Sequence, residues 1–144
     1  MSQENVEIVR RLFDFIELLG GRIEPDELAS QLSDAALGEL FDPDLELVPT
    51  PQGMLAGASY QGYEGIRRFA ADFFAAWDEF RIEPQEFREV SDQVVALLRV
   101  RGRMHELELD EAWSGLYKLR NGRVLRMQTF TSRGGALEAA GLRE

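Results

Sequence analysis

Glu111 is the carboxylate that the sequence places best for chemistry. Side chains two residues apart on an extended strand share a face, so Glu111 lies on the same face as Trp113, Gly115 and Tyr117. A carboxylate beside an indole in a partly apolar mouth could act as a general acid or base. The more common arrangement is a solvated glutamate at a strand end, or one paired with a nearby arginine. Glu111 is therefore a candidate to which the sequence alone assigns no reaction.

Glu46 is the second candidate carboxylate. It alternates with Leu45 and Leu47 and shares parity with Val48, so it too could point inward. Pairing with an arginine, or capping a neighbouring segment, is the more common use of such a residue.

Aromatic and small polar side chains accompany these carboxylates. Tyr117 could use its hydroxyl to orient a carbonyl or hydroxyl group of a ligand, and Tyr60 and Tyr63 could act as lid residues over a pocket mouth. Core packing is the alternative for the buried aromatic residues, and it is favoured for Trp77. The residues expected to line a ligand pocket are Phe15, Phe73, Trp77, Leu98, Val100, Trp113, Tyr117, Met127 and Thr129.

Metal and thiol chemistry have little support in the sequence. The chain contains no cysteine and one histidine, His105, which falls in an expected turn. We therefore expect no metal site and no cofactor. Arg99, Arg101 and Arg103 could form an anion site, but they alternate with apolar residues and are expected to face outward, with balanced charge or dimer contacts around them.

The overall charge limits the possible partners. The formal net charge is −10, which opposes binding to phosphate backbones and to anionic lipids. No apolar run approaches the roughly 20 residues that span a bilayer, and the chain opens with polar residues rather than a signal peptide. We expect one domain over residues 1–144, in the cytoplasm, with neither nucleic acid nor membrane as a partner.

The strongest helix signal follows a glycine-containing loop. In the segment from Tyr60 to Phe80, apolar residues recur at three- and four-residue steps, with Phe69, Phe73 and Trp77 on one stripe. Such a stripe needs a broad apolar partner, and the strand-rich second half of the chain is the only candidate large enough. The first half of the chain is expected to begin with a long helix ended by Gly20-Gly21. Short helical segments from Pro25 to Phe41, a turn at Phe41-Asp-Pro-Asp44, a strand at 45–48 and a loop at 49–63 follow. After the aromatic helix we expect an edge strand at 81–90, strands at 92–103, 107–119 and 124–132, and a short helix at 136–142.

Two patterns fix the pairing of the later strands. Period-two alternation marks residues 92–103, and Asn121-Gly122 supplies the positive φ angles of a tight hairpin. Helices before a meander of long strands predict an α+β domain in which helices cover one face of a strongly curved, mostly antiparallel sheet.

Four segments carry a resemblance to a known family. They are Phe41-Asp-Pro-Asp-Leu-Glu46, Tyr60-Gln-Gly-Tyr-Glu-Gly-Ile66, Asn121-Gly-Arg-Val124 and Ala136-Leu-Glu-Ala-Ala-Gly-Leu142. In this order and spacing the chain resembles the SnoaL-like branch of the nuclear transport factor 2 superfamily. The resemblance implies a cone whose sheet curls round an apolar pocket, and a homodimer through the outer sheet face.

The resemblance also supplies catalytic positions that can be tested one by one. An isomerase of this superfamily would have its base near Val48, its phenol near Phe15 and its protonated carboxyl near Gly115. An epoxide hydrolase would have its charged set near Val100, Gly102 and Thr129. None of these residues can move a proton as those mechanisms require. We therefore expect a protein that binds a small, largely apolar organic molecule, with an enzyme using Glu111 or Glu46 for proton transfer as the alternative.

Overall fold

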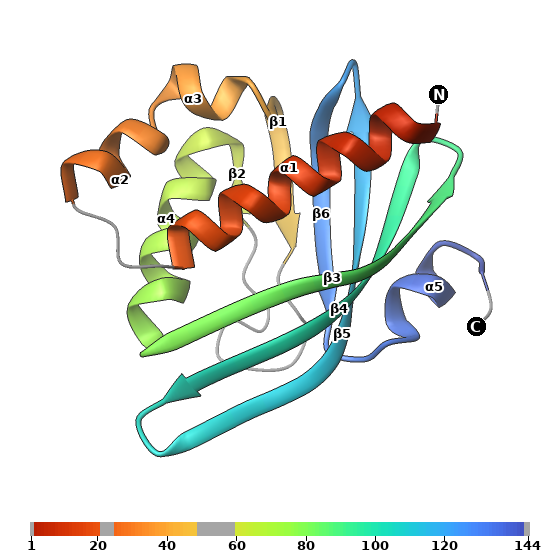
Figure 1. The fold of residues 1–144 in the computed structure, drawn as a ribbon. Helices are drawn as coiled ribbons and strands as arrows, with labels where there is room; N and C mark the ends of the chain where they lie inside the picture. Colours follow the sequence, from red (N-terminus) through yellow and green to blue (C-terminus); the bar gives the residue numbers. More distant parts are fainter. Residues whose placement is uncertain (1, 21–24, 49–59, 143–144) are drawn as a thin grey trace.

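The computed structural model describes residues 2–20, 25–48 and 60–142 of the chain. It is an α+β fold in which helices pack on a curved, six-stranded, mostly antiparallel sheet (Figure 1). The predicted fold class is confirmed. The helices are α1 (Ser2–Gly20), α2 (Pro25–Gln31), α3 (Asp34–Gly38), α4 (Gly62–Ala76) and α5 (Gly135–Ala139).

The sheet has the strand order β2-β1-β6-β5-β4-β3. Neighbouring strands pair in antiparallel fashion except β1 and β6, which are parallel. The strands are β1 (Phe41–Val48), β2 (Tyr60–Gln61), β3 (Glu79–Val90), β4 (Gln93–Met104), β5 (Leu107–Arg120) and β6 (Arg123–Phe130).

Helix α1 crosses the sheet (Figure 1). Its Val9, Leu12 and Phe13 are buried, as its wide apolar arc predicts, and Phe13 packs against Phe87 of β3 with ring centroids 6.2 Å apart. We call the face of the sheet that α1 covers the inner face, and the opposite face, on which α5 lies, the outer face. No helix among the described residues is long and apolar enough to cross a membrane.

Strand β4 shows how the two faces divide. Its even-numbered residues from Val94 to Val100 belong to the large core cluster under α1, whereas Val95 and Leu97 form a second cluster with Ala136 and Leu137 of α5. This alternation is the period of two read from the sequence. Both faces of the central sheet are therefore covered by helices.

A buried serine connects α5 to the sheet. The Ser114 hydroxyl of β5 donates a 2.6 Å hydrogen bond to the carbonyl of Ser132, and it accepts one of 2.9 Å from the backbone N–H of Ala136. Since Ser114 is fully buried, both hydrogen bonds are shielded from water.

The expected hairpin turn is present. Asn121 and Gly122 have φ angles of 53° and 76°, as a two-residue turn with positive φ at both positions requires. His105 lies in the turn between β4 and β5 with a φ of 55°, and its side chain is exposed, as predicted.

The first strand differs from the sequence prediction. Phe41-Asp-Pro-Asp44, expected as a turn before the strand, belongs to β1. The register with β6 moves from Phe41–Val124 to Glu46–Arg126, so four residues of β1 oppose one residue of β6. This irregularity replaces the turn. The segment expected as a loop up to residue 63 also ends early, because Tyr60 and Gln61 form β2 and α4 begins at Gly62.

Candidate functional site

The inner face brings most of the predicted ligand residues together. Cross-strand pairs share a face, so the register of β4, β5 and β6 places these residues on one wall. The pairs are Leu98 with Trp113, Val100 with Glu111, Tyr117 with Met127, and Gly115 with Thr129. Leu98, Val100, Trp113, Tyr117 and Met127 are all buried in a single core cluster.

Tyr117 folds back over the main chain of its own strand. A Cβ added to Gly115 would lie 2.6 Å from Cζ of Tyr117, and closer still to its hydroxyl oxygen. A residue larger than glycine at position 115 would therefore displace the tyrosine ring. Phe13 of α1 meets the same ring edge to face, with centroids 5.7 Å apart at 84°. No local pattern in the sequence indicates that Phe13 contacts Tyr117, because the two residues lie far apart along the chain.

The Tyr117 hydroxyl is a polar group in an apolar environment. The side chain is almost fully buried, and burial raises the pKa of the phenol well above its usual range. Within the described part of the chain, no group forms a hydrogen bond with this hydroxyl. Because the described residues leave this hydroxyl without a partner, its oxygen is a candidate contact for a ligand.

Glu111 is held by its neighbour on the strand. Trp113 Nε1 donates a 2.8 Å hydrogen bond to Glu111 Oε1. The Glu111 side chain is exposed rather than enclosed, although its position opposite Val100 puts it on the inner face. Among the described residues, its Oε2 has neither a hydrogen bond nor an ion pair. One carboxylate oxygen is thus fixed and the other is open to an incoming donor.

Trp77 packs against the main chain of β4. A Cβ on Gly102 would lie 2.7 Å from Cζ3 of the Trp77 indole, whose ring centroid is 5.4 Å from that of Phe80. The indole therefore fills the space that Gly102 leaves on the inner face, which is a packing role.

Among the remaining predicted wall residues, Phe15 and Thr129 are only half-buried, and the side chain of Phe73 is not described. Phe15 is half-buried and packs edge to face on Phe41, with centroids 5.8 Å apart, so it lies near β1. Thr129 is half-buried beside Gly115. The side chain of Phe73 lies outside the described part of the structure.

Tyr60 and Tyr63 belong to the packed body of the protein. Tyr60 is buried, its hydroxyl is 3.0 Å from Asp72 Oδ2, and its ring meets that of Phe69 at 5.5 Å. Burial and the Asp72 hydrogen bond raise the pKa of Tyr60. The Tyr63 hydroxyl donates to the carbonyl of Phe41 at 3.1 Å. Both hydroxyls are hydrogen-bonded to other elements, and a lid role for these two tyrosines stays a prediction.

Glu46 lies on the outer face and not on the inner one. Leu45 and Leu47 on either side of it are buried in the core, and the Glu46 carboxylate accepts a 2.9 Å hydrogen bond from Arg126 Nε. Glu46 therefore pairs with an arginine, which is the more common use of such a residue.

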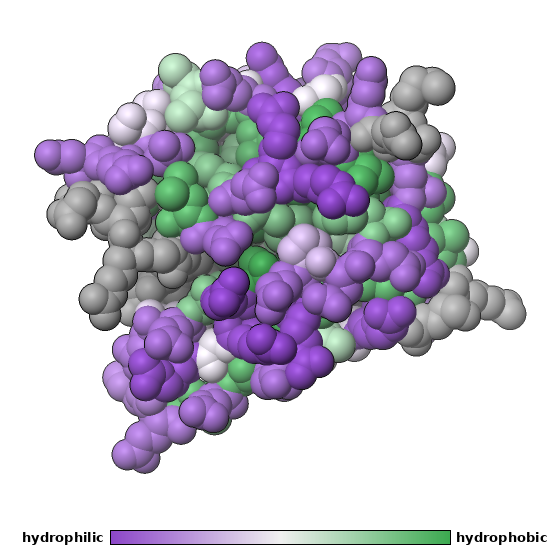
Figure 2. Space-filling view, viewed as in Figure 1, coloured by the Kyte–Doolittle hydropathy of each residue, from purple (hydrophilic) through white to green (hydrophobic). Residues whose placement is uncertain are grey.

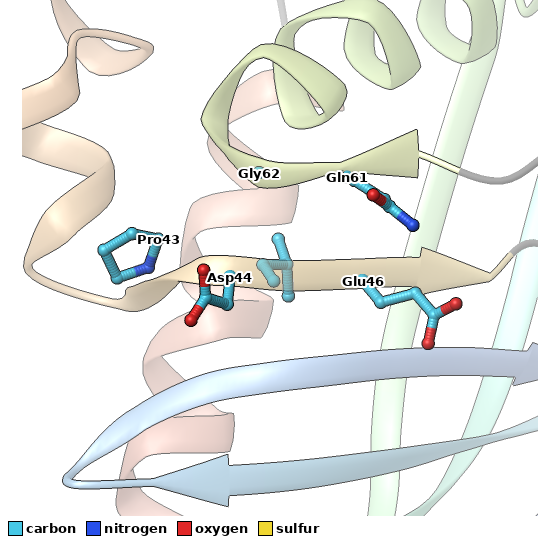
Figure 3. A pocket seen from close by; sticks show the side chains of 6 residues that line it. Pro43, Asp44, Glu46, Gln61 and Gly62 are labelled. Atoms are coloured by element: carbon cyan, nitrogen blue, oxygen red, sulfur yellow. The ribbon is translucent and has the colours of Figure 1, made fainter.

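An open cleft of about 530 Å³ runs along β1 and β2 near Glu46. Figure 3 shows Asp44 and Glu46 on the side of β1 that faces β6. Both carboxylates already pair with arginines, Asp44 with Arg120 and Glu46 with Arg126. The cleft is lined by Pro43, Asp44, Leu45, Glu46, Gln61 and Gly62.

Arg120 holds the irregular part of β1 in place. Its Nε and Nη2 donate to the two carboxylate oxygens of Asp42 at 3.0 and 2.8 Å, and Asp42 is buried. The hydrogen bond from Arg120 and that from the backbone N–H of Asp44 lower the pKa of Asp42. The sequence showed the Phe41-Asp-Pro-Asp44 motif but not its arginine partner, which is 78 positions away.

The outer face carries the three strand arginines in ion pairs. Arg99 binds Asp110 with two hydrogen bonds of 2.6 and 2.9 Å, Arg101 pairs with Glu83, and Arg103 pairs with Glu79. The predicted outward orientation is therefore the observed one. Within the described part of the chain, no group of three or more metal-ligating side chains could hold a metal ion.

Comparisons with known proteins agree with this architecture. A sequence profile of the SnoaL-like domain matches residues 27–132, which is most of the chain. The chain belongs to the SnoaL-like family. No curated protein matches the sequence of this SnoaL-like chain.

Solved structures of SnoaL-like and NTF2-like proteins share the fold. An NTF2-like protein of unknown function from Burkholderia pseudomallei is 20% identical, with 96% of this chain and 97% of that chain covered and a TM-score of 0.70. A candidate SnoaL-like polyketide cyclase from Jannaschia sp. is 19% identical, with 99% and 94% covered and a TM-score of 0.65. A protein with a ketosteroid isomerase-like fold from Catenulispora acidiphila, in complex with trimethylamine, is 19% identical, with 90% and 93% covered and a TM-score of 0.59.

Proposed function

We propose that the chain binds a small, largely apolar organic molecule on the inner face of its sheet. The site is a strip of β5 formed by Tyr117, Gly115, Trp113 and Glu111. Gly115 lies four positions after Glu111, a length of about 13 Å on an extended strand. A ligand of a few fused or linked rings would match this length.

The buried hydroxyl of Tyr117 is the observation that carries this proposal. It lies in an apolar core, and the described residues offer it no hydrogen bond. A carbonyl or hydroxyl oxygen of a ligand would accept from this donor and offset its desolvation. The surrounding apolar wall would supply most of the remaining binding free energy.

Two observations favour binding over the reactions known for this superfamily. The positions that the resemblance assigns to an isomerase hold Val48, Phe15 and Gly115, and the space at Gly115 is filled by the Tyr117 phenol. The positions assigned to an epoxide hydrolase hold apolar residues, glycine or threonine. The relative in complex with trimethylamine supports the view that this fold accepts small organic molecules.

Proton transfer by Glu111 is the second candidate function. The Trp113 indole fixes one carboxylate oxygen, and the other is free to approach a substrate proton. Glu46 is the weaker alternative, because Arg126 already occupies it on the outer face. A substrate whose turnover is lost in Glu111→Gln while its binding persists would favour the enzyme.

A binding titration with 2-naphthylmethanol tests the proposed site. We expect the wild type to bind it, and Tyr117→Phe to bind it about fivefold more weakly because only one hydroxyl is lost. The same substitution should change the free energy of unfolding by less than about 1 kcal/mol, since it removes no hydrogen bond to a described residue. Tyr63→Phe is the matched control, because its hydroxyl bonds to Phe41 instead. Equal binding by Tyr117→Phe and the wild type would contradict the assigned role of this hydroxyl.

A homodimer through the outer face stays a prediction. Helix α5 covers part of that face, and the area beyond it carries the ion pairs of Arg99, Arg101 and Arg103. Such balanced charge suits a polar interface between two copies related by a twofold axis. Sedimentation of a monomer at micromolar concentration would contradict the dimer.

A further inference from the structure

We propose that the ligand of the inner face carries a positively charged amine, which Glu111 binds. This inference rests on the proposed function, because it names the chemical class of a ligand for the same strip of β5. It follows from the position of one carboxylate relative to every charged side chain on the neighbouring strands.

One hydrogen bond orients the Glu111 carboxylate, and it involves only one of the two carboxylate oxygens. Trp113 Nε1 donates to Oε1 at 2.8 Å, whereas Oε2 has no partner among the described residues. Because Trp113 is buried, its indole limits the orientations of the carboxylate. An oriented carboxylate with one free oxygen can accept a charge-assisted hydrogen bond at little further cost in side-chain entropy.

The positions around Glu111 on the inner face carry no positive charge. Val100 lies opposite it on β4, Ile82 opposite Val100 on β3, and Leu109 and Trp113 lie on either side of it along β5. The arginines of β4 alternate to the other face. An anionic ligand would therefore meet a carboxylate that these neighbours do not compensate, whereas a cation would find a counter-ion there.

On the outer face, the arginines of β4 form ion pairs with acidic residues of the neighbouring strands. Arg99, Arg101 and Arg103 all form ion pairs with acids on β3 or β5, including a two-hydrogen-bond pair between Arg99 and Asp110. Glu111 differs from the acids that pair with these arginines, Glu79, Glu83 and Asp110, because it lies on the inner face. An apolar molecule with one terminal ammonium group matches the two features of this end of the wall, its apolar surface and the Glu111 carboxylate. Glu89, the other inner-face carboxylate, lies farther along the sheet, opposite Val94. The Trp113 ring could add cation–π attraction.

Three naphthalene probes separate charge from shape. They are 2-naphthylmethylamine, which is an ammonium ion at pH 7, neutral 2-naphthylmethanol and anionic 2-naphthoate. We expect the wild type to bind the ammonium probe about fivefold to tenfold more tightly than the alcohol, and the alcohol more tightly than the carboxylate.

Two variants with the same change in charge locate the effect. Glu111→Gln should remove the preference, so that the variant binds the ammonium probe no more tightly than the alcohol. Glu108→Gln removes an exposed carboxylate on the outer face of the same strand, so it controls for the long-range attraction of a chain with a net charge of −10. It should keep the preference.

The outcomes distinguish this inference from the proposed function. Binding of the alcohol with no preference for the ammonium probe, or a preference that survives in Glu111→Gln, would overturn the inference and leave the proposed function standing. Failure of all three probes to bind would contradict both. Repeating the measurement at 50 and 300 mM salt supplies a second readout, because binding of the ammonium probe should weaken with salt more in the wild type than in Glu111→Gln.

Discussion

The phenol of Tyr117 lies directly over the main chain of Gly115, two residues earlier on the same strand. This relationship explains why glycine occupies position 115 at the centre of a long strand, where it otherwise weakens the sheet. It also explains how a hydroxyl comes to lie inside an apolar core, since the ring turns along the strand instead of reaching the surface. An aromatic ring also covers a glycine at Gly102, where the ring is that of Trp77 from another segment of the chain.

Gly115→Ala should destabilise the protein by about 1–3 kcal/mol, because the new methyl group would overlap the Tyr117 ring. Urea denaturation measures the loss. In a Tyr117→Leu background the same substitution should cost clearly less, because the overlapping ring atoms are gone. Equal costs in the two backgrounds would mean that the ring is not what excludes a side chain at position 115.

Asp42→Asn should lower the free energy of unfolding by an amount that depends on pH. Arg120 and the Asp44 N–H lower the pKa of Asp42, so its stabilising effect is fully present above the unfolded pKa of about 3.9 and is lost as pH falls through the lower folded value. Because the Arg120 side chain is almost half exposed, we expect a loss of only about 1 kcal/mol at pH 7. The gap between variant and wild type should narrow below pH 4 in urea denaturation. A gap that stays constant from pH 7 to pH 3 would contradict the role given to the Asp42 charge.

Ser114→Ala should weaken the attachment of α5 to the sheet. The substitution removes a buried hydroxyl that joins the Ser132 carbonyl to the Ala136 N–H, at a cost of about 1–3 kcal/mol. Hydrogen exchange should accelerate at residues 135–142 before it does in the rest of the chain. Ser132→Ala, which removes an exposed hydroxyl bonded to the Gly135 N–H, is the milder control. Equal protection of α5 in wild type and Ser114→Ala would show that the apolar contacts of Leu137 suffice.

Local patterns in the sequence predicted much of the sheet. The alternation of Val94 to Val100 gave the correct inner and outer faces, and Asn121-Gly122 gave the correct hairpin, because both signals act within a few residues. The grouping of Leu98, Trp113 and Tyr117 on one wall followed from those two patterns.

The first strand shows why the rest could not be predicted. Its face assignment depends on the irregular register with β6 and on an arginine 78 positions away, neither of which leaves a local pattern. A shift of one residue reverses the face of every side chain, so parity with Val48 left two uses open for Glu46, an inward position and pairing with an arginine. The structure contains the second, with Arg126. The hydrogen bonds of Tyr60 and Tyr63 to distant elements were invisible for the same reason.

Most of the inner-face apolar wall is buried. Figure 2 shows hydrophobic residues emerging between bands of hydrophilic side chains on the side where α1 crosses the sheet. A reporter inside the wall is therefore more informative than one on its surface, and the chain supplies one in an indole N–H.

The indole N–H signal of Trp113 in a ¹⁵N-correlated NMR titration tests the central claim most directly. The chain has two tryptophans, so Trp113→Phe identifies the signal by its disappearance. Addition of 2-naphthylmethanol should shift the Trp113 signal in a saturable manner, because the Trp113 Nε1–H points at Glu111 within the proposed strip. A saturable shift confined to signals of the outer face, with the Trp113 signal unchanged, would contradict a ligand site on the inner face.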